Sequence, residues 1–227
     1  MHEISYSKSE NNFINKTLLY MAIGLIITFA VGYFVSTNLS MMMLIYSNPA
    51  FFIGVVIIEL SLVVILSRKI SKLSIQGALA MFIAYSTING LTFGSIFVIY
   101  SLESIISIFI VTAAMFFCCS MIGMTAKRDL STLGRVAIMG VVGILIASLF
   151  NIFIGSSGLS IAVNYIGIAV FCALTAYDMQ KVKLIHERNY SYDTTTTNKF
   201  AIIAALELYL DFVNLFIHLI SILGKKK

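Results

Sequence analysis

Four acidic side chains fall inside long apolar stretches of the sequence, where a charge is costly. They are Glu59, Asp178, Glu207 and Asp211. A carboxylate at the centre of a lipid bilayer costs about 2.5–3.5 kcal/mol on insertion scales, so such a residue usually faces a partner or a water-filled cavity. The four residues are therefore the first candidates for handling protons or cations. For any one of them, the plainer interpretation is a carboxylate that only holds two helices together.

The last apolar stretch carries a polar stripe. Glu207, Asp211, Asn214 and His218 are separated by 4, 3 and 4 residues, a spacing that places all four on one face of a helix. Asparagine and histidine alone would indicate hydrogen bonds between helices. Two carboxylates on the same face favour a path for cations or protons.

Asp178 ends the preceding apolar stretch, and it could approach Asp211 if either helix extends beyond its apolar run. Two carboxyl groups held close together in a low dielectric share a proton instead of both ionising, whereas a nearby Arg stabilises the ionised pair. Arg68 lies at the same predicted depth, although a basic flank at the membrane surface is its more ordinary interpretation. Such a pair would act as a pH switch, with a gating direction that does not follow from sequence.

The elements that position these residues are predicted to be membrane helices. Of the 227 residues, 59% are hydrophobic and only 11% are charged, which is too little charge to cover the surface of a soluble domain. Uncharged runs of this length indicate membrane spans, and in lipid such spans must be helices unless they alternate in polarity as barrel strands do. The predicted fold is an all-α integral membrane protein. The net charge of +5 lies in the loops and gives no hint of nucleic-acid binding.

The uncharged runs predict seven helices. Ser47-Asn48-Pro49 and Gly155-Ser156-Ser157-Gly158 divide the two longest runs. The expected helices cover residues 17–35, 50–66, 75–100, 105–125, 136–153, 159–178 and 200–223. The chain is then a cytoplasmic segment (1–16), one membrane domain (17–223) and a basic tail (224–227).

The distribution of basic residues predicts the orientation. Twelve of the 15 Lys and Arg lie in the N-terminal segment and in every second loop, whereas residues 36–49, 101–104 and 154–158 contain none. The positive-inside rule therefore predicts a cytoplasmic N-terminus. Seven spans would place Lys225, Lys226 and Lys227 outside, so the last helix is expected either to be re-entrant or to cross late. The absence of targeting or retention signals favours a bacterial plasma membrane.

Beyond composition, five sequence runs resemble one family. They are Asn89-Gly90-Leu91-Thr92, Thr125-Ala126-Lys127-Arg128-Asp129-Leu130-Ser131 with Leu133-Gly134, Ala147-Ser148-Leu149-Phe150-Asn151, Leu174-Thr175-Ala176-Tyr177-Asp178, and Leu208-Tyr209-Leu210-Asp211-Phe212-Val213-Asn214-Leu215-Phe216. With these runs the chain resembles the Bax-inhibitor family from the first predicted helix to its end.

The resemblance implies a seven-helix bundle with a central last helix and a pH-sensitive calcium leak. The family's aspartate pair maps onto Asp178 and Asp211, which would be the pH sensor and the transient calcium ligands. Its arginine maps onto Arg68, and Glu59 matches the acidic residue of that helix. Glu207 is an addition to the family pattern. The implied partners are the bilayer, calcium and protons, with no resident cofactor, and the link of eukaryotic members to cell death has no support in this sequence.

Three other functions remain open. An intramembrane aspartyl protease also carries two aspartates on adjacent helices, but its Gly-x-Gly-Asp run is replaced here by Tyr209-Leu210-Asp211, so no enzyme is predicted. A proton-coupled transporter would bind its substrate along the polar stripe, and it should show inverted repeats. In a non-conducting scaffold, the carboxylates would be structural. Cys118, Cys119 and Cys172 lie in apolar runs and indicate helix packing.

Overall fold

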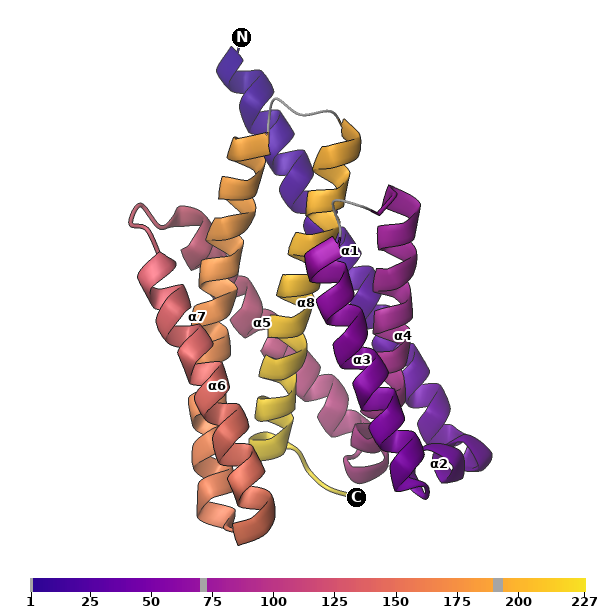
Figure 1. The fold of residues 1–227 in the computed structure, drawn as a ribbon. Helices are drawn as coiled ribbons and strands as arrows, with labels where there is room; N and C mark the ends of the chain where they lie inside the picture. Colours follow the sequence, from indigo (N-terminus) through magenta and orange to yellow (C-terminus); the bar gives the residue numbers. More distant parts are fainter. Residues whose placement is uncertain (1, 70–72, 190–193) are drawn as a thin grey trace. The chain divides into compact units, whose positions relative to one another are not determined.

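The computed structural model describes residues 2–69, 73–189 and 194–227, and their side chains other than those of residues 2–8, 67–69, 189 and 194–197. In these ranges the chain forms eight α-helices (Figure 1). They are α1 (His2–Thr37), α2 (Leu39–Tyr46), α3 (Pro49–Lys69), α4 (Ile75–Ile99), α5 (Leu102–Thr125), α6 (Ser131–Ile154), α7 (Ser157–Asn189) and α8 (Thr194–Leu223). Strand pairing among the described residues is limited to one isolated bridge between Tyr100 and Lys226.

Seven of the described helices are long and apolar enough to cross a membrane, and α2 is the exception. This confirms the predicted fold class, an all-α integral membrane bundle. The last helix is also the most buried of the seven candidate spans, because 67% of its apolar window lies inside the protein, against 44% or less for the others.

Four helix boundaries lie five or more residues from their predicted positions, and one of them is the start of α8 at Thr194 instead of residue 200. α1 begins at His2, not at residue 17, and α6 begins at Ser131, not at residue 136. α7 continues to Asn189 instead of ending at residue 178. Charge marks where apolar sequence ends, but a helix can continue past that point when its polar side chains find partners. In α7, Gln180 finds its partner on the loop between α5 and α6, and Lys183 finds its partner on the last turn of α5.

α2 was not predicted at all, because its residues belong to an uncharged run that was expected to be a loop. The Asn38 side chain accepts a hydrogen bond from the Met41 backbone N–H and so caps the first turn. Ile45 is buried, while Leu39, Met43 and Leu44 are exposed. A helix of eight residues is too short for the periodicity of its hydrophobic residues to distinguish it from a loop.

The described residues divide into two compact units. Unit 1 takes its residues from Met1–Ser101, Ile185–Tyr209 and Lys226–Lys227, and unit 2 from Leu102–Leu184 and Leu210–Lys225. The helices α7 and α8 contribute to both units.

In unit 1, α1 and α4 run in parallel and approach closely through glycines of α4. A Cβ on Gly90 would lie 2.6 Å from Val31, and one on Gly94 would lie 2.8 Å from Val35. Phe29 of α1 packs edge-on against Phe93. α3 packs against α4, and α2 bridges α1 and α3 (Figure 1). Small residues at these positions let the two backbones come together, as is usual in membrane helix pairs.

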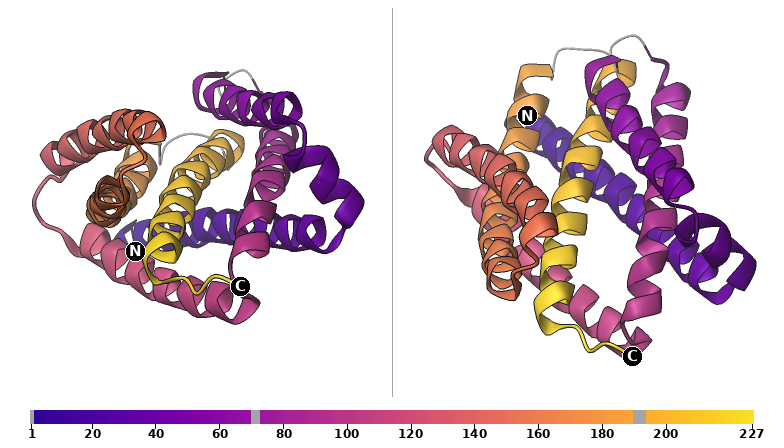
Figure 2. Two further views of the ribbon diagram at one scale, coloured as in Figure 1. Left: turned by 90° about the horizontal axis from the view of Figure 1, so that it is seen from below. Right: turned by 60° about the horizontal axis from the view of Figure 1, so that its bottom comes forward.

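In unit 2, α6 and the first part of α7 lie side by side (Figure 2). Gly140 faces Val170, and a Cβ on Gly134 would lie 2.5 Å from the Tyr177 ring. Gly123 of α5 lies against the Ala176 carbonyl of α7. Close helix contacts on both sides therefore fix the segment of α7 that precedes Asp178.

The C-terminal tail is bound to the end of α4. The Lys227 backbone N–H donates to the Ile99 carbonyl at 3.0 Å, and the Lys227 ammonium donates to the Phe97 carbonyl at 2.7 Å. At its other end, α8 begins near α1, where Lys16 donates to Asn198 at 2.7 Å. α8 is one uninterrupted helix, so the structure gives no support to a re-entrant last helix.

Candidate functional site

The structure divides the predicted site residues between the two units. Asp178, Asp211, Asn214 and His218 belong to unit 2, whereas Glu59, Glu207 and Arg68 belong to unit 1. Arg68 lies in α3, but its side chain is outside the described residues. Its predicted pairing with the aspartates therefore stays a prediction.

Asp178 lies on a part of α7 that is held by the α5–α6 loop. The Gln180 side chain accepts from the Leu130 backbone N–H at 2.8 Å and donates to the Arg128 carbonyl at 2.8 Å. Lys183 donates to the Met124 carbonyl at 3.0 Å. Backbone groups of the loop and of the last turn of α5 are thus bound by α7 side chains. Asp178 itself is half-buried within this rigid frame.

Asp211 is the most buried of the predicted site residues, with only 3% of its surface exposed. Its neighbour in sequence, Phe212, packs against Phe109 and Phe116 of α5 with ring centroids 5.2 and 5.6 Å apart. These aromatic contacts fix the rotation of α8 around Asp211. Both aspartates of the predicted pair are therefore held by well-packed helices of the same unit.

The four residues of the predicted stripe on α8 differ in exposure. Glu207 and Asn214 are half-buried, whereas Asp211 and His218 are buried. Asn214 donates to the Leu210 carbonyl of its own helix at 2.8 Å. The His218 Nδ1 lies 2.9 Å from the Asn164 Oδ1, and its ring stacks on Phe171 and fills the space left by Gly167. His218 therefore has the contacts of a packed residue that links α7 and α8.

Glu59 is at the edge of a polar network that the sequence did not reveal. Its Oε1 accepts a short hydrogen bond from the Asn89 side-chain N–H and a 3.4 Å bond from the Tyr85 hydroxyl. The Asn89 Oδ1 in turn accepts from the Tyr209 hydroxyl at 3.0 Å. The Tyr209 oxygen lies 2.6 Å from the Thr28 hydroxyl oxygen, which lies 2.8 Å from the Ser86 carbonyl.

This network joins four helices of unit 1. Glu59 comes from α3, Tyr85 and Asn89 from α4, Tyr209 from α8 and Thr28 from α1. Tyr209 and Thr28 are fully buried, and Asn89 is 5% exposed, whereas Glu59 is only half-buried. One sequence signal was available, because Tyr85, Asn89 and Thr92 are spaced 4 and 3 residues apart on one helix face. The partners on other helices could not be read from it.

The described residues contain no group of three or more His, Cys, Asp and Glu side chains arranged to hold a metal ion. A resident calcium site takes six to eight oxygen ligands. The assignment of Asp178 and Asp211 as transient calcium ligands stays a prediction. The three cysteines are free.

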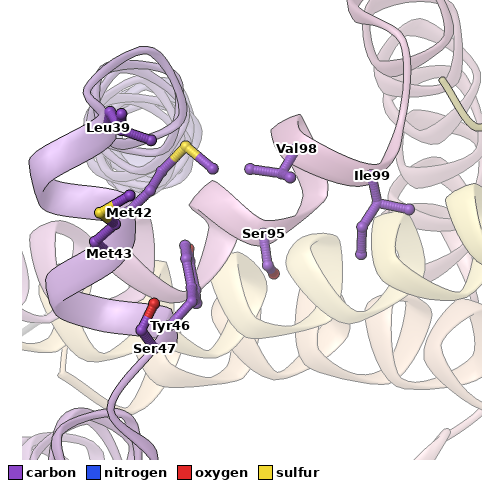
Figure 3. Close-up of a pocket in the computed structure, with 8 residues that line it drawn as sticks. All are labelled: Leu39, Met42, Met43, Tyr46, Ser47, Ser95, Val98 and Ile99. Atoms are coloured by element: carbon purple, nitrogen blue, oxygen red, sulfur yellow. The ribbon is translucent and has the colours of Figure 1, made fainter.

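A hollow of about 390 Å³ lies between α2 and the C-terminal end of α4 (Figure 3). It contains none of the predicted site residues. At its wall, the Tyr46 hydroxyl donates to the Leu91 carbonyl at 2.6 Å, and burial raises the pKa of this phenol. The hollow is lined by Leu39, Met42, Met43, Tyr46, Ser47, Ser95, Val98 and Ile99.

Comparison with known proteins identifies the family. A family model described as inhibitor of apoptosis-promoting Bax1 matches residues 10–227. The inner membrane protein YbhL of Escherichia coli strain K12 is 44% identical over 92% of this chain and 89% of its own. A protein of Borreliella burgdorferi is 38% identical over 100% of this chain and 99% of its own, and a membrane protein of Streptococcus pyogenes is 34% identical over 98% and 97%. The chain is thus a multi-pass membrane protein that belongs to the Bax inhibitor family.

Proposed function

We propose that the protein is a pH-sensitive calcium leak channel of the membrane, in which Asp178 and Asp211 form the proton-sharing sensor. One observation carries the proposal. Two aspartates at membrane depth belong to the same compact unit, and one of them is 97% buried by packed helices. A carboxylate is costly to keep in such a place, so it is expected to serve a proton or cation path.

Glu207 and Asn214 are the proposed path residues beside the sensor. They share the less buried face of α8, where a passing cation could exchange water for carboxylate and amide oxygens. His218 is a weaker candidate for the path, because its ring is enclosed by Phe171 and Gly167. We assign to Arg68 the role of stabilising the ionised aspartates.

The proposed location is a bacterial plasma membrane with the N-terminus in the cytoplasm. The relative from Escherichia coli is named an inner membrane protein, and the basic residues of this chain gather at one end of successive helices. The turn that follows α4 carries no charge, and the positive-inside rule therefore places this end of α4 on the outer side. The tail is bound to the same end of α4, so the proposal also places Lys225, Lys226 and Lys227 on the outer side.

The test is calcium entry into liposomes that contain the purified protein and a trapped dye, followed between about pH 5 and pH 8. The wild-type protein is expected to leak calcium at a rate that changes with pH. Asp178→Asn and Asp211→Asn keep the size of the side chain but remove its titration. Each is therefore expected to abolish the pH dependence.

Glu103→Gln is the matched control, because it neutralises an exposed carboxylate at the start of α5. It should leak as the wild type does. Folded wild-type protein that passes no calcium at any pH would refute the channel and favour a transporter or a scaffold. A pH-dependent leak that survives both aspartate substitutions would keep the channel and move the sensor elsewhere.

A further inference from the structure

The hydroxyl protons of the network in unit 1 are too few for its contacts. Thr28 and Tyr209 carry one hydroxyl proton each. Three contacts each require a hydroxyl proton. They join Thr28 to the Ser86 carbonyl, Thr28 to Tyr209, and Tyr209 to Asn89. While the Asn89 oxygen faces Tyr209, only two of the three can be hydrogen bonds at one time. The network therefore has a second arrangement, in which the Asn89 amide is turned over.

In the first arrangement every donor points towards Glu59. Thr28 donates to Tyr209, Tyr209 donates to the Asn89 Oδ1, and the Asn89 N–H donates to the carboxylate. The Ser86 carbonyl then no longer accepts from the Thr28 hydroxyl. It still accepts the helical hydrogen bond of α4, in which each N–H donates to the fourth carbonyl before it. A chain of donors ending at one oxygen stabilises that oxygen when it is charged.

In the second arrangement the donors point away from Glu59. A protonated Glu59 can donate its own O–H to the Asn89 oxygen once the amide has turned over, and the two ends of an amide have nearly the same shape. The turned amide presents its N–H to Tyr209. The Tyr209 proton then goes to Thr28, and Thr28 donates to the Ser86 carbonyl.

The surroundings leave Glu59 as the group that selects between the two arrangements. Tyr85, Asn89 and Thr92 of α4 face its carboxyl group, and Tyr209 of α8 faces it through Asn89. In the part of the chain that the structure describes, no Lys, Arg or second carboxyl group contacts it. The Tyr209 ring is held edge-on by Phe82 and Tyr85, with centroids 5.8 and 5.7 Å apart, so its hydroxyl proton is the part free to change direction.

We propose that Glu59 is a proton-binding site of unit 1, and that Asn89 transmits its protonation state to Tyr209 on α8. The ligand is a proton and not a metal ion, because a single carboxylate surrounded by hydrogen-bond donors lacks the oxygen ligands that a cation needs. Glu59 is half-buried at the edge of the network, while Tyr209 is fully buried. The site does not depend on the proposed calcium leak.

Infrared difference spectra of the full chain in lipid, taken between about pH 8 and pH 5, test the proposal. In the wild type, acidification is expected to produce the carbonyl band of a protonated buried carboxylic acid. It is also expected to shift the C–O band of tyrosine in ring-labelled protein. The spectra are compared in protein that carries Asp178→Asn and Asp211→Asn, so that the carboxyl groups of the proposed sensor contribute no band. Glu59→Gln keeps a hydrogen-bonding side chain of the same size, and in this background it should lose both signals.

Tyr209→Phe should keep the carboxyl band and lose the tyrosine shift. Tyr165→Phe, which alters an exposed tyrosine on α7, should keep both signals. A carboxyl band that persists in Glu59→Gln in the Asp178→Asn and Asp211→Asn background would overturn the site. A tyrosine shift that persists in Tyr209→Phe would overturn the transmission through Asn89. Because no step involves calcium, these results are independent of the liposome experiment.

Discussion

The two compact units place polar groups among apolar helices in different ways. In unit 1, one carboxylate is linked to hydroxyl and amide groups from three other helices, and the network reaches fully buried side chains. In unit 2, the polar side chains near Asp178 bind backbone groups of the α5–α6 loop and of the last turn of α5. Unit 1 is thus held by a network that can change direction, whereas the loop contacts of unit 2 have one arrangement.

This difference suggests separate roles for the two regions. A backbone carbonyl or N–H cannot change its charge or exchange donor for acceptor, so the Gln180 and Lys183 contacts can only fix a position. Hydroxyl groups can exchange donor and acceptor roles without moving their heavy atoms, and a side-chain amide can do so by turning over. Substitutions in each unit test whether the two regions differ in this way.

The largest effect is expected from Gly123→Ala in unit 2. The added Cβ would press on the Ala176 carbonyl oxygen, and a backbone atom cannot yield as a flexible side chain can. Overpacking costs about 1–3 kcal/mol, and this variant should lose about 3 kcal/mol or fail to fold. Gly143→Ala, with no atom near its Cβ, should instead gain about 0.5–1 kcal/mol. Thermal unfolding in detergent measures both, and equal stabilities would show that α5 and α7 are not packed as described.

Gln180→Ala should have the next largest effect. It removes the partner of the Leu130 N–H and of the Arg128 carbonyl, and an unsatisfied group of this kind costs about 1–3 kcal/mol. Because Gln180 is half-buried, water can replace part of the loss, and we expect about 1–2 kcal/mol. Gln76→Ala, at an exposed position of α4, is the control. A free energy of unfolding unchanged in both variants would mean that the loop does not need α7.

The network of unit 1 should give a smaller but measurable coupling. A double-mutant cycle of Thr28→Val and Tyr209→Phe isolates their contact, and such cycles in membrane proteins average about 0.6 kcal/mol with a maximum near 1.7. The short Thr28–Tyr209 contact, 2.6 Å between oxygens, should lie in the upper part of that range. Thr28→Val combined with Tyr165→Phe should be additive. Additivity in the first cycle as well would indicate that the network does not couple α1 to α8.

The smallest effect is expected at Asp129, in the loop before α6. Its carboxylate accepts from the Ser131 hydroxyl at 2.6 Å and from the Ser131 backbone N–H at 2.8 Å, and these bonds lower its pKa. Because the pKa of Asp129 is lower in the folded protein than its usual value of about 3.9, the ionised carboxylate stabilises the fold at a pH above that usual value. This stabilisation is lost as the pH falls through the pKa of the folded protein. Asp129→Asn should therefore reduce the loss of melting temperature on acidification below about pH 4. An unchanged acid slope would assign that loss to other carboxyl groups.

The spans could be predicted because long uncharged runs have no other stable form in lipid. The extension of α7 could not, because Lys181, Lys183 and Arg188 look like the end of a span until their partners are known. The rigid frame around Asp178 depends on glycine contacts such as Gly134 with Tyr177, which join positions far apart in sequence. The network of unit 1 was missed for the same reason, because its members come from four helices and only Glu59 was conspicuous.

The bound C-terminal tail has a consequence for the response of the chain to voltage. In the proposed orientation, the three lysine charges of the tail lie on the outer side of a membrane whose cytoplasmic side is electrically negative. Moving one charge through the membrane potential changes the free energy by about 2.3 kcal/mol for each 100 mV, so the potential pulls all three lysines back towards the cytoplasm. The contacts of Lys227 with the Phe97 and Ile99 carbonyls oppose that pull, and they place the end of α8 under an electrical load whenever the membrane is energised.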